Sequence, residues 1–244
     1  MCEIVYGIHV IESILYKNPD RFLEVYIINN YNTRLKKLVY FLQKYDILIK
    51  FVNKKFLYNI VKYYGVHQGI VAKIKKNVFK NDIFSFVSSR SRSLLLVLDG
   101  ITDSRNLGAC FRNAEAAGVD AIIVPKHRSA KLNAIAKKSS SGSSELVPFF
   151  RVNNLSRVLN FLKSCNFWII GTSSNSNHSL YNAKVDSDSL VLILGSEDKG
   201  MRFLTSKYCN EIVSVPMFGL ISSLNVSVVS GICLFEFIRK RKYK

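Results

Sequence analysis

The stretch VSVPMFGLISSLNVSVVSGICLFEFIRKRKYK, residues 213–244, holds the end of a strand, a loop and a long helix. Pro216 has no backbone N–H and Gly219 tolerates positive φ, so the strand must end and a loop must follow. Apolar residues and a glycine then recur at helical spacing, and cations occupy the last turn, where the helix dipole favours them. The repeating positions are Leu224, Val228, Gly231, Phe235 and Ile238.

Short polar residues precede this helix. Ser222, Ser223 and Asn225 lie beside backbone N–H groups that no helical carbonyl can reach, and such a helix start can hold an anion or a polar ligand. An ordinary N-cap formed by Ser222 or Ser223 is the simpler alternative. Inside the helix, the small residues Ser227, Ser230 and Gly231 predict close approach of another backbone, in a tightly packed or intersubunit helix.

Composition indicates a folded protein with a polyanionic partner. The chain has 244 residues, 48% of them hydrophobic, and no run approaches the ~20 apolar residues of a membrane span. No signal-peptide pattern is present, so a cytoplasmic protein without membrane contact is expected. The formal charge of +18 fits binding to nucleic acid, although the Lys, Asn and Ile content of an AT-rich genome could also produce it.

The cysteines indicate neither disulfides nor a metal. They are five in number, scattered, and without a C-x-x-C pair, so we expect free thiols and no bound metal. The five are Cys2, Cys110, Cys165, Cys209 and Cys233.

Two α/β patterns follow one another along the chain. The first, residues 1–75, predicts a small α/β unit with helices at 8–16, 33–45 (capped by Thr33) and 54–64, and strands at 24–28, 47–52 and 69–74. A polar, basic stretch at 76–92 predicts a linker. The second pattern, residues 93–244, predicts a doubly wound parallel sheet with strands at 94–98, 121–124, 148–151, 167–170, 190–194 and from 212, and helices at 106–117, 130–138, 155–164, 201–208 and up to 238. The serine-rich stretch 139–144 is expected to be a mobile loop.

Polar residues gather where the strands of the second pattern end, the edge at which open α/β sheets bind ligands. No G-x-G-x-x-G follows the first strand, and Met201 stands where the lysine of a P-loop belongs, so neither a dinucleotide nor ATP is favoured. No histidine lies in these segments. The candidate catalytic residues are Asn106, Arg112, Glu197, Ser223 and Asn225.

These residues lack an ordinary base for neutral pH. They therefore favour a reaction whose electrophile needs mainly positioning and charge stabilisation, and methyl transfer from a sulfonium fits. A surface salt bridge for Arg112 and a dipole-stabilised carboxylate at a helix start for Glu197 remain open as structural roles.

Three segments together resemble the SpoU/TrmH family of RNA ribose 2′-O-methyltransferases, in the SPOUT superfamily. They are DSRNLGACFRNAEAAG (103–118), VLILGSEDKGM (191–201) and VPMFGLISSLNVSV (215–228). The similarity also reaches YGIHV (6–10), VHQGIVA (66–72) and IVPKHRSAKLNA (123–134), and so covers essentially the full length.

The resemblance implies an N-terminal RNA-binding domain resembling ribosomal protein L30e, a C-terminal sheet with a deep trefoil knot, and a homodimer. It implies S-adenosylmethionine as methyl donor, held near Thr172, Gly195, Val215 and Leu224. Arg112 would activate or orient the ribose hydroxyl, and the other four candidates would complete the pocket. The implied substrate is a guanosine of 23S rRNA in the peptidyl-transferase P loop, with no role for DNA.

Two alternatives stay open at this stage. The same chemistry could act on tRNA or another rRNA site, or the chain could be a non-catalytic RNA-binding assembly factor. Two residues also depart from the family pattern: Ser104 stands where proline is usual and is expected to loosen the following loop, and Asp198 stands where glycine is common. Aspartate tolerates the left-handed conformation, so we expect the turn to survive with an added negative charge beside the cofactor.

Overall fold

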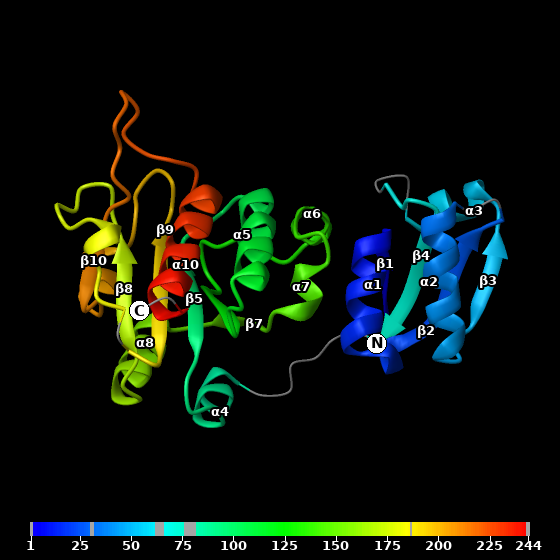
Figure 1. Cartoon of the computed structure of the whole chain (residues 1–244), viewed down its shortest axis with the longest axis horizontal. Helices are drawn as coiled ribbons and strands as arrows, with labels where there is room; N and C mark the ends of the chain where they lie inside the picture. Colours follow the sequence, from blue (N-terminus) through cyan, green and yellow to red (C-terminus); the bar gives the residue numbers. More distant parts are fainter. Residues whose placement is uncertain (1, 30–31, 62–65, 76–81, 186, 243–244) are drawn as a thin grey trace. The chain divides into compact units, whose positions relative to one another are not determined.

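The chain forms two compact units. The structure, a computed structural model, describes residues 2–29, 32–61, 66–75, 82–185 and 187–242 (Figure 1). One unit comprises Met1–Val78 together with Ser141–Leu146, and the other comprises Phe79–Ser140 and Val147–Lys244.

The first unit is built on a four-stranded sheet in the order β1-β4-β2-β3, formed by β1 (Cys2–Tyr6), β2 (Phe22–Ile28), β3 (Ile49–Val52) and β4 (Ile70–Lys75). Strand β4 pairs antiparallel with both neighbours, and β2 pairs parallel with β3. The α/β prediction for this segment is correct, but it lacked β1, whose alternating burial is too short to register as a periodic pattern.

Helices cover this sheet on two sides. Helices α1 (Ile8–Lys17) and α2 (Thr33–Lys44) share the larger core with the sheet, and α3 (Lys54–Ile60) packs on a smaller cluster around Leu57. A short 3-10 turn, η1 (Pro19–Arg21), leads into β2. The cap of α2 is Asn32 rather than Thr33, because the Asn32 Oδ1 accepts from the Leu35 N–H at 3.0 Å. The predicted continuation of α3 over 62–64 lies outside the described residues.

The serine-rich stretch is not the mobile loop predicted from its composition. Residues Ser143–Leu146 form the short helix α7, and Ser140, Ser143 and Ser144 are buried. Glu145 is 5% exposed and pairs with the Arg21 guanidinium at 2.9 Å, so this segment belongs to the first unit.

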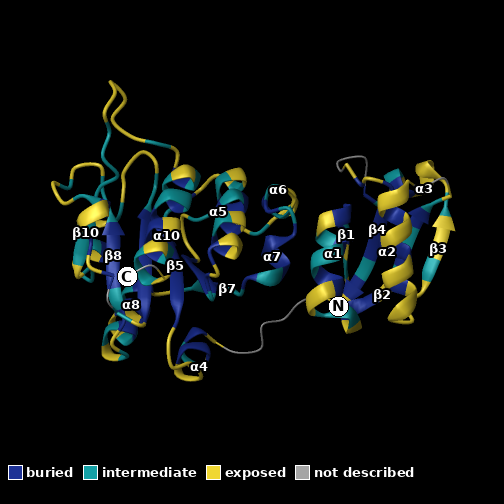
Figure 2. Cartoon of the chain, viewed as in Figure 1, coloured by how far each residue is buried: buried dark blue, intermediate teal, exposed yellow. Residues whose placement is uncertain are grey.

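The second unit is built on six parallel strands in the order β10-β8-β9-β5-β6-β7. Its two central strands, β5 and β9, are almost entirely buried (Figure 2). The bounds are β5 (Leu94–Asp99), β6 (Ala121–Pro125), β7 (Phe149–Val152), β8 (Trp168–Thr172), β9 (Leu190–Gly195) and β10 (Glu211–Val213). The predicted parallel sheet is confirmed.

Helices cover both faces of this sheet, as expected for a doubly wound fold. One core contains residues of α5 (Ser104–Ala116), α6 (Ala134–Ser139) and α10 (Val226–Lys242). The other contains α4 (Ile83–Ser88) and α8 (Leu155–Ser164), with α9 (Phe203–Ser206) against α8. A second 3-10 turn, η2 (Leu180–Asn182), packs against α10.

Part of the predicted linker 76–92 is therefore helical. Helix α4 places Ile83, Phe86 and Val87 in the core of the second unit, and residues 76–81 lie outside the described part of the chain. The helix was not predicted because it has only six residues and is followed by a polar stretch of serines and arginines.

Three helices begin elsewhere than predicted, and polar caps explain two of them, α5 and α6. Helix α5 starts at Ser104, not Asn106, because the Asp103 carboxylate accepts from the Arg105 N–H at 2.7 Å. Helix α6 starts after Asn133, not at 130. Helix α9 is the single turn 203–206 within the predicted 201–208.

Helices α5 and α10 pack closely through small side chains. The Asn113 amide donates to the Ser227 carbonyl at 2.6 Å and to the Ser230 hydroxyl at 2.7 Å, beside Gly231. The predicted close approach at this small-residue run is thus confirmed within the chain. On the other side of α5, a Cβ at Gly108 would lie 2.4 Å from the Ala136 carbonyl oxygen.

We expect Gly108→Ala to destabilise the second unit by about 1–3 kcal/mol, the usual cost of overpacking. Gly219→Ala is the matched control, since a Cβ there meets nothing within 4 Å, and its effect should stay within about 1 kcal/mol. Trp168 on β8 is the only tryptophan, so its fluorescence during urea unfolding reports on this unit. Equal midpoints for the two variants would contradict the assigned packing.

Candidate functional site

A cavity of about 380 Å³ opens at the carboxyl ends of β8, β9 and β10. The four residues expected to hold a cofactor, Thr172, Gly195, Val215 and Leu224, all line it. The remaining lining residues are Ser173, Ser174, Asn175, Ser196, Glu197, Asp198, Lys199, Gly200, Val213, Met217, Ser222, Ser223, Val226 and Val229.

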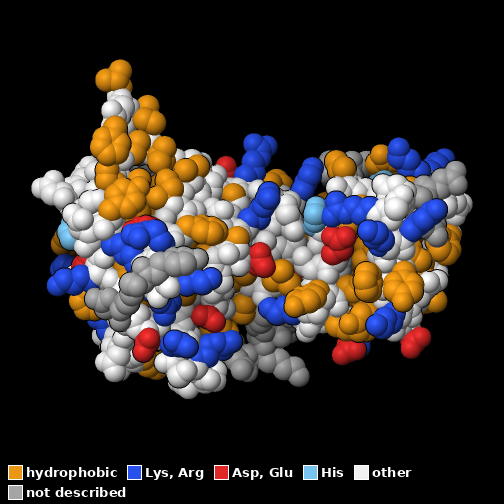
Figure 3. Space-filling view, viewed as in Figure 1, with side chains coloured by type: hydrophobic (Ala, Val, Ile, Leu, Met, Phe, Trp, Pro, Cys, Tyr) orange, Lys and Arg blue, Asp and Glu red, His pale blue; other side chains and the backbone are white. Residues whose placement is uncertain are grey.

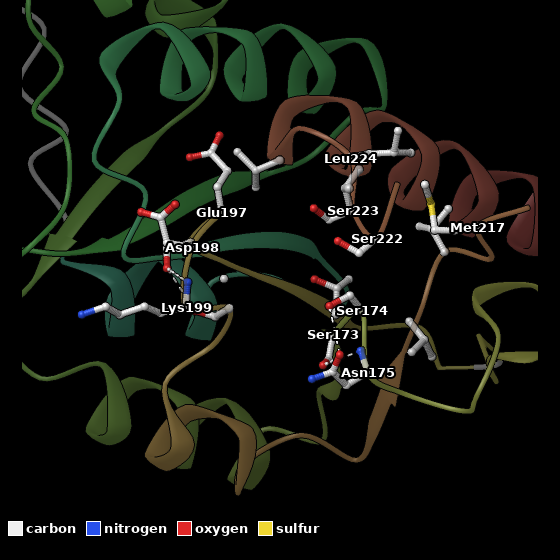
Figure 4. A pocket seen from close by; sticks show the side chains of 18 residues that line it. Ser173, Ser174, Asn175, Glu197, Asp198, Lys199, Met217, Ser222, Ser223 and Leu224 are labelled. Carbon is white, nitrogen blue, oxygen red and sulfur yellow. Dashed lines mark hydrogen bonds between the residues drawn. The ribbon is translucent and has the colours of Figure 1, made fainter. Parts of the chain in front are cut away.

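Three loops form the walls, each following a different strand (Figure 4). The loop after β8 supplies the polar residues 173–175, and the loop after β9 supplies the turn 196–200. The loop after β10 adds Met217 and the stretch 222–224. The cavity thus combines hydroxyl and amide groups with an apolar wall that includes Val213, Val215 and Val229.

The turn after β9 depends on the missing side chain of Gly195. The Ser196 N–H donates to the Gly200 carbonyl at 3.1 Å and the Gly200 N–H donates back at 2.9 Å, so the chain folds tightly onto itself. A Cβ at Gly195 would lie 2.1 Å from the Gly200 carbonyl carbon, which leaves no room for any side chain. Among the described residues of this turn, the left-handed conformation belongs to Gly200, at φ +64°, and not to Asp198 as expected. Asp198 keeps ordinary backbone angles and brings its charge to the cavity rim.

Three of the five predicted catalytic residues meet at the start of α10. The Asn106 amide donates to the Glu197 carboxylate, and the Asn225 amide donates to the Asn106 carbonyl oxygen at 3.1 Å and to Glu197 at 3.4 Å. The Val226 backbone N–H also donates to the Glu197 carboxylate. We call Asn106, Glu197 and Asn225 the polar corner; it joins α5, the turn 196–200 and α10.

Asn225 is also the cap of α10. Its Oδ1 accepts from the Ser227 N–H at 2.9 Å, so the N-cap suggested for Ser222 or Ser223 is wrong. Those two serines line the cavity instead.

The environment of Glu197 favours its protonated form. Partial loss of water raises the pKa of this carboxyl, and the negative charges of Asp103 and Asp198 raise the pKa further. The Val226 N–H and the Asn106 amide oppose that shift by donating to the charged form.

Among the described residues, Arg112 forms no hydrogen bond to the polar corner. It is exposed on α5, six residues after Asn106, and is not among the cavity-lining residues. Ser104, where proline was expected, is the first residue of α5, and its hydroxyl accepts from the Asn133 amide at 2.9 Å. This bond tethers the region that the missing proline was expected to loosen.

Sequence reasoning missed the support beneath the turn 196–200. Asp99, 1% exposed at the end of β5, accepts from the Arg202 backbone N–H at 3.1 Å and pairs with its guanidinium at 3.3 Å. An acid that closes a fully buried strand was the available signal, because burying a carboxylate requires a partner.

Nothing in the described residues adds a metal or a membrane span to this site. No group of three or more His, Cys, Asp or Glu side chains in those ranges is placed to hold a metal ion. None of the helices that the structure describes combines the length and apolar character needed to cross a bilayer. Burial raises the pKa of the Cys110 and Cys233 thiols to about 12, which keeps both unreactive.

Two family models match the chain. The model of the SpoU rRNA Methylase family matches residues 93–235, and the model described as RNA 2′-O ribose methyltransferase substrate binding matches residues 4–79. The chain belongs to the SpoU rRNA methylase family, which confirms the resemblance found in the sequence.

Two relatives are similar to the chain over nearly its full length. The chain is 47% identical to a Yersinia pestis protein, over the full length of both, and 46% identical to one from Escherichia coli K12, over 99% of this chain and 100% of the other. Each of these relatives is named 23S rRNA (guanosine-2′-O-)-methyltransferase RlmB.

Solved structures show the same fold at lower identity. The SpoU methyltransferase AviRb from Streptomyces viridochromogenes, solved with the cofactor AdoMet, matches with a TM-score of 0.79 at 20% identity, over 98% of this chain and 90% of that one. An AdoMet-bound rRNA methyltransferase from Sinorhizobium meliloti matches with a TM-score of 0.78 at 19% identity, over 100% and 88%.

Glu197→Gln should change the pH dependence of stability. Because the folded state raises the pKa of Glu197 above its ordinary 4.5, it binds the proton more tightly than the unfolded chain does, and the wild type loses stability as pH rises through that window. Glutamine does not ionise, so the Tm of the variant should rise relative to that of the wild type as the pH increases above about 4.5.

The control for this experiment is Glu115→Gln, which removes an exposed carboxylate from α5. Thermal unfolding followed by Trp168 fluorescence at several pH values compares the two variants. A Tm difference from wild type that is the same for both variants at every pH would contradict the environment assigned to Glu197.

Proposed function

We propose that this protein transfers a methyl group from S-adenosylmethionine to the ribose 2′-hydroxyl of a guanosine in 23S rRNA, in the peptidyl-transferase P loop. Family membership supports the reaction class, and the full-length relatives carry this activity in their names. A 23S rRNA substrate also suits a chain with a formal charge of +18 and implies a cytoplasmic location.

The observation that carries the proposal is the position of the polar corner at the edge of the cavity. Glu197 belongs to both, and Leu224 and Val226, which line the cavity, flank Asn225. A ligand in the cavity therefore lies next to a fixed set of amide and carboxylate groups, as a group-transfer reaction requires.

The cavity residues fit a nucleoside with a charged tail. Its hydroxyl and amide groups at 172–175 can bond a ribose and polar ring edges, and Val213, Val215 and Val229 offer an apolar surface to a flat ring. The carboxylates of Glu197 and Asp198 suit a cation. When bound, S-adenosylmethionine supplies a methyl group on positively charged sulfur.

The protein's own residues have to orient the hydroxyl and lower its affinity for its proton. A fixed cation does this by stabilising the oxyanion, and Arg112 is the candidate we assign to it. Asn106 and Asn225 fix the Glu197 carboxylate, and Ser223 offers a further hydroxyl at the cavity wall. We assign the holding of the cofactor to Thr172, Gly195, Val215 and Leu224.

The two halves divide this work in the proposal. Residues 1–75, which resemble ribosomal protein L30e, bind the RNA, and residues 93–244, with α4 of the predicted linker packed into their core, carry out the transfer. The match of residues 4–79 to a substrate-binding model supports this division. We also propose the deep trefoil knot around the cavity. In its support, the Lys240 side chain of α10 donates to the Tyr181 and Ala183 carbonyls at 2.8 Å, which ties the helix to η2 and the residue after it, in the loop that follows β8.

A homodimer completes the proposal. Val228 and Phe235, seven residues apart on α10, are 48% and 52% exposed, and Phe218 and Leu220 on the loop before it are fully exposed. Hydrophobic side chains cover this projecting loop (Figure 3). Contiguous apolar surface of this kind marks an interface. A monomer mass in analytical ultracentrifugation at micromolar concentration would contradict the dimer.

The direct test is transfer of labelled methyl from S-adenosylmethionine to unmodified 23S rRNA, with the site mapped by primer extension at low nucleotide concentration. A stop at the P-loop guanosine is the expected result. Label at another rRNA site or on tRNA would keep the reaction and reject the substrate. Binding of cofactor and RNA without transfer would favour a non-catalytic assembly factor.

Arg112→Ala should reduce methyl transfer by at least about 100-fold, the scale seen when one stabilising donor is removed from a reaction centre. Because Arg112 lies outside the cavity lining, cofactor affinity and oligomeric state should not change. Arg157→Ala, which removes an arginine on α8, is the control and should retain activity. Turnover of Arg112→Ala near that of the wild type would show that its assigned role is wrong.

A further inference from the structure

The loop after β6 carries a cluster of cations that the reaction described above does not use. The cations are Lys126, Arg128 and Lys131, which are exposed, as is His127 between them, and we call residues 126–131 the basic loop. Within the described parts of the chain, none of these four side chains forms an ion pair with a carboxylate.

The backbone of the basic loop is held at both ends. The Lys126 N–H donates to the Val152 carbonyl at 2.8 Å, and the Ala130 N–H donates to the Ile101 carbonyl at 2.7 Å. The loop also keeps Arg128 at φ +57°, a conformation that costs a non-glycine residue of order 1 kcal/mol.

Two other arginines satisfy carbonyl groups of this loop. Arg151 donates to the Lys126 carbonyl at 2.9 Å, and Arg202 donates to the His127 carbonyl at 3.5 Å. The loop's own cations are thus not needed to hold it together. A rigid backbone that presents unpaired cations is a preorganised site for anions.

The loop is anchored beside the polar corner. Strand β6 pairs with β5, and the segment after the loop is tied to the start of α5 by the bond from Asn133 to Ser104 and by the bond from the Ser139 hydroxyl to the Arg105 carbonyl at 3.0 Å. Asn106 is the next residue of that helix.

Charge differs across this edge of the sheet. The carboxylates of Glu197 and Asp198 line the cavity with the single cation Lys199, and Asp103 adds its charge beside Glu197, whereas the basic loop contains no carboxylate. An RNA strand with its ribose at the polar corner would have the most favourable electrostatic energy with its phosphates directed toward the basic loop. Such phosphate contacts would fix the position of the strand without reading its sequence.

We propose that the basic loop binds the phosphate backbone of the substrate RNA beside the target nucleotide, through Lys126, Arg128 and Lys131, and so positions the ribose. This inference rests on the proposed function. It gives the catalytic unit its own RNA contact, separate from the RNA-binding role of residues 1–75.

The test compares wild type with the triple variant Lys126→Gln, Arg128→Gln and Lys131→Gln in the full-length chain. The matched control is Lys163→Gln, Lys184→Gln and Lys207→Gln, which removes the same charge near β8 and β10, at the opposite side of the sheet. The probe is an unmodified 23S rRNA fragment, used in methyl transfer and in fluorescence anisotropy at several salt concentrations.

We expect the loop variant to raise KM for RNA about tenfold or more, with kcat at saturating RNA and S-adenosylmethionine affinity near wild type. The slope of log affinity against log salt should fall by about 2, because each single-strand phosphate contact contributes about 0.7. The control should match the wild type. The charge-conserving variant Lys126→Arg, Arg128→Lys and Lys131→Arg should recover most of the loss.

Unchanged KM and salt slope in the loop variant would overturn the proposal. A drop in kcat with an unchanged slope would also overturn it, because the loop would then act on the reaction centre rather than on phosphates. If the wild type itself bound RNA and cofactor but transferred no methyl, the proposed function would fail, and the salt slopes would still decide whether the loop binds RNA.

Discussion

The carboxylate of Glu197 at the start of α10 is the interaction on which the site depends. It accepts from the Val226 N–H and from Asn106, and so ties the turn after β9 to two helices that come from distant parts of the chain. Helix dipole and amide donors stabilise its charge, and lost water and two neighbouring acids oppose it.

The backbone beneath this carboxylate packs so tightly that a side chain cannot fit at one of its positions. Gly195 leaves no volume for a side chain, so the turn can fold back only one way, and Asp99 then fixes its far end through Arg202. The small residues of α10 likewise let this helix approach Asn113 of α5 closely. The contact of Gly195 with Gly200 and the contact of α5 with α10 therefore fix the positions of the cavity walls. The side chains of those walls are mostly small.

The sequence was sufficient to predict the sheet and the ends of its strands, because uninterrupted apolar runs such as Leu94–Leu98 have few alternatives to a buried parallel strand. Strand ends then located the cavity and brought Asn106, Glu197 and Asn225 into one neighbourhood. Periodicity could not locate β1, α4 or α7, since each is too short for a repeating pattern to emerge and each depends on contacts with distant segments. Cap positions were displaced for a related reason: several polar residues near a helix start compete for the same N–H groups, and only tertiary packing selects Asp103 or Asn32.

The buried pair of Arg21 and Glu145 joins residues that are far apart in sequence. Glu145 and its helix belong to the first unit although they lie between α6 and β7 of the second. On the ribosome, the amino-terminal unit therefore cannot complete its packing when its own 78 residues have emerged, and must wait until residue 146 has left the exit tunnel. By then β5 and β6 of the second unit have also emerged, so the second unit is already part-synthesised before the first can finish packing.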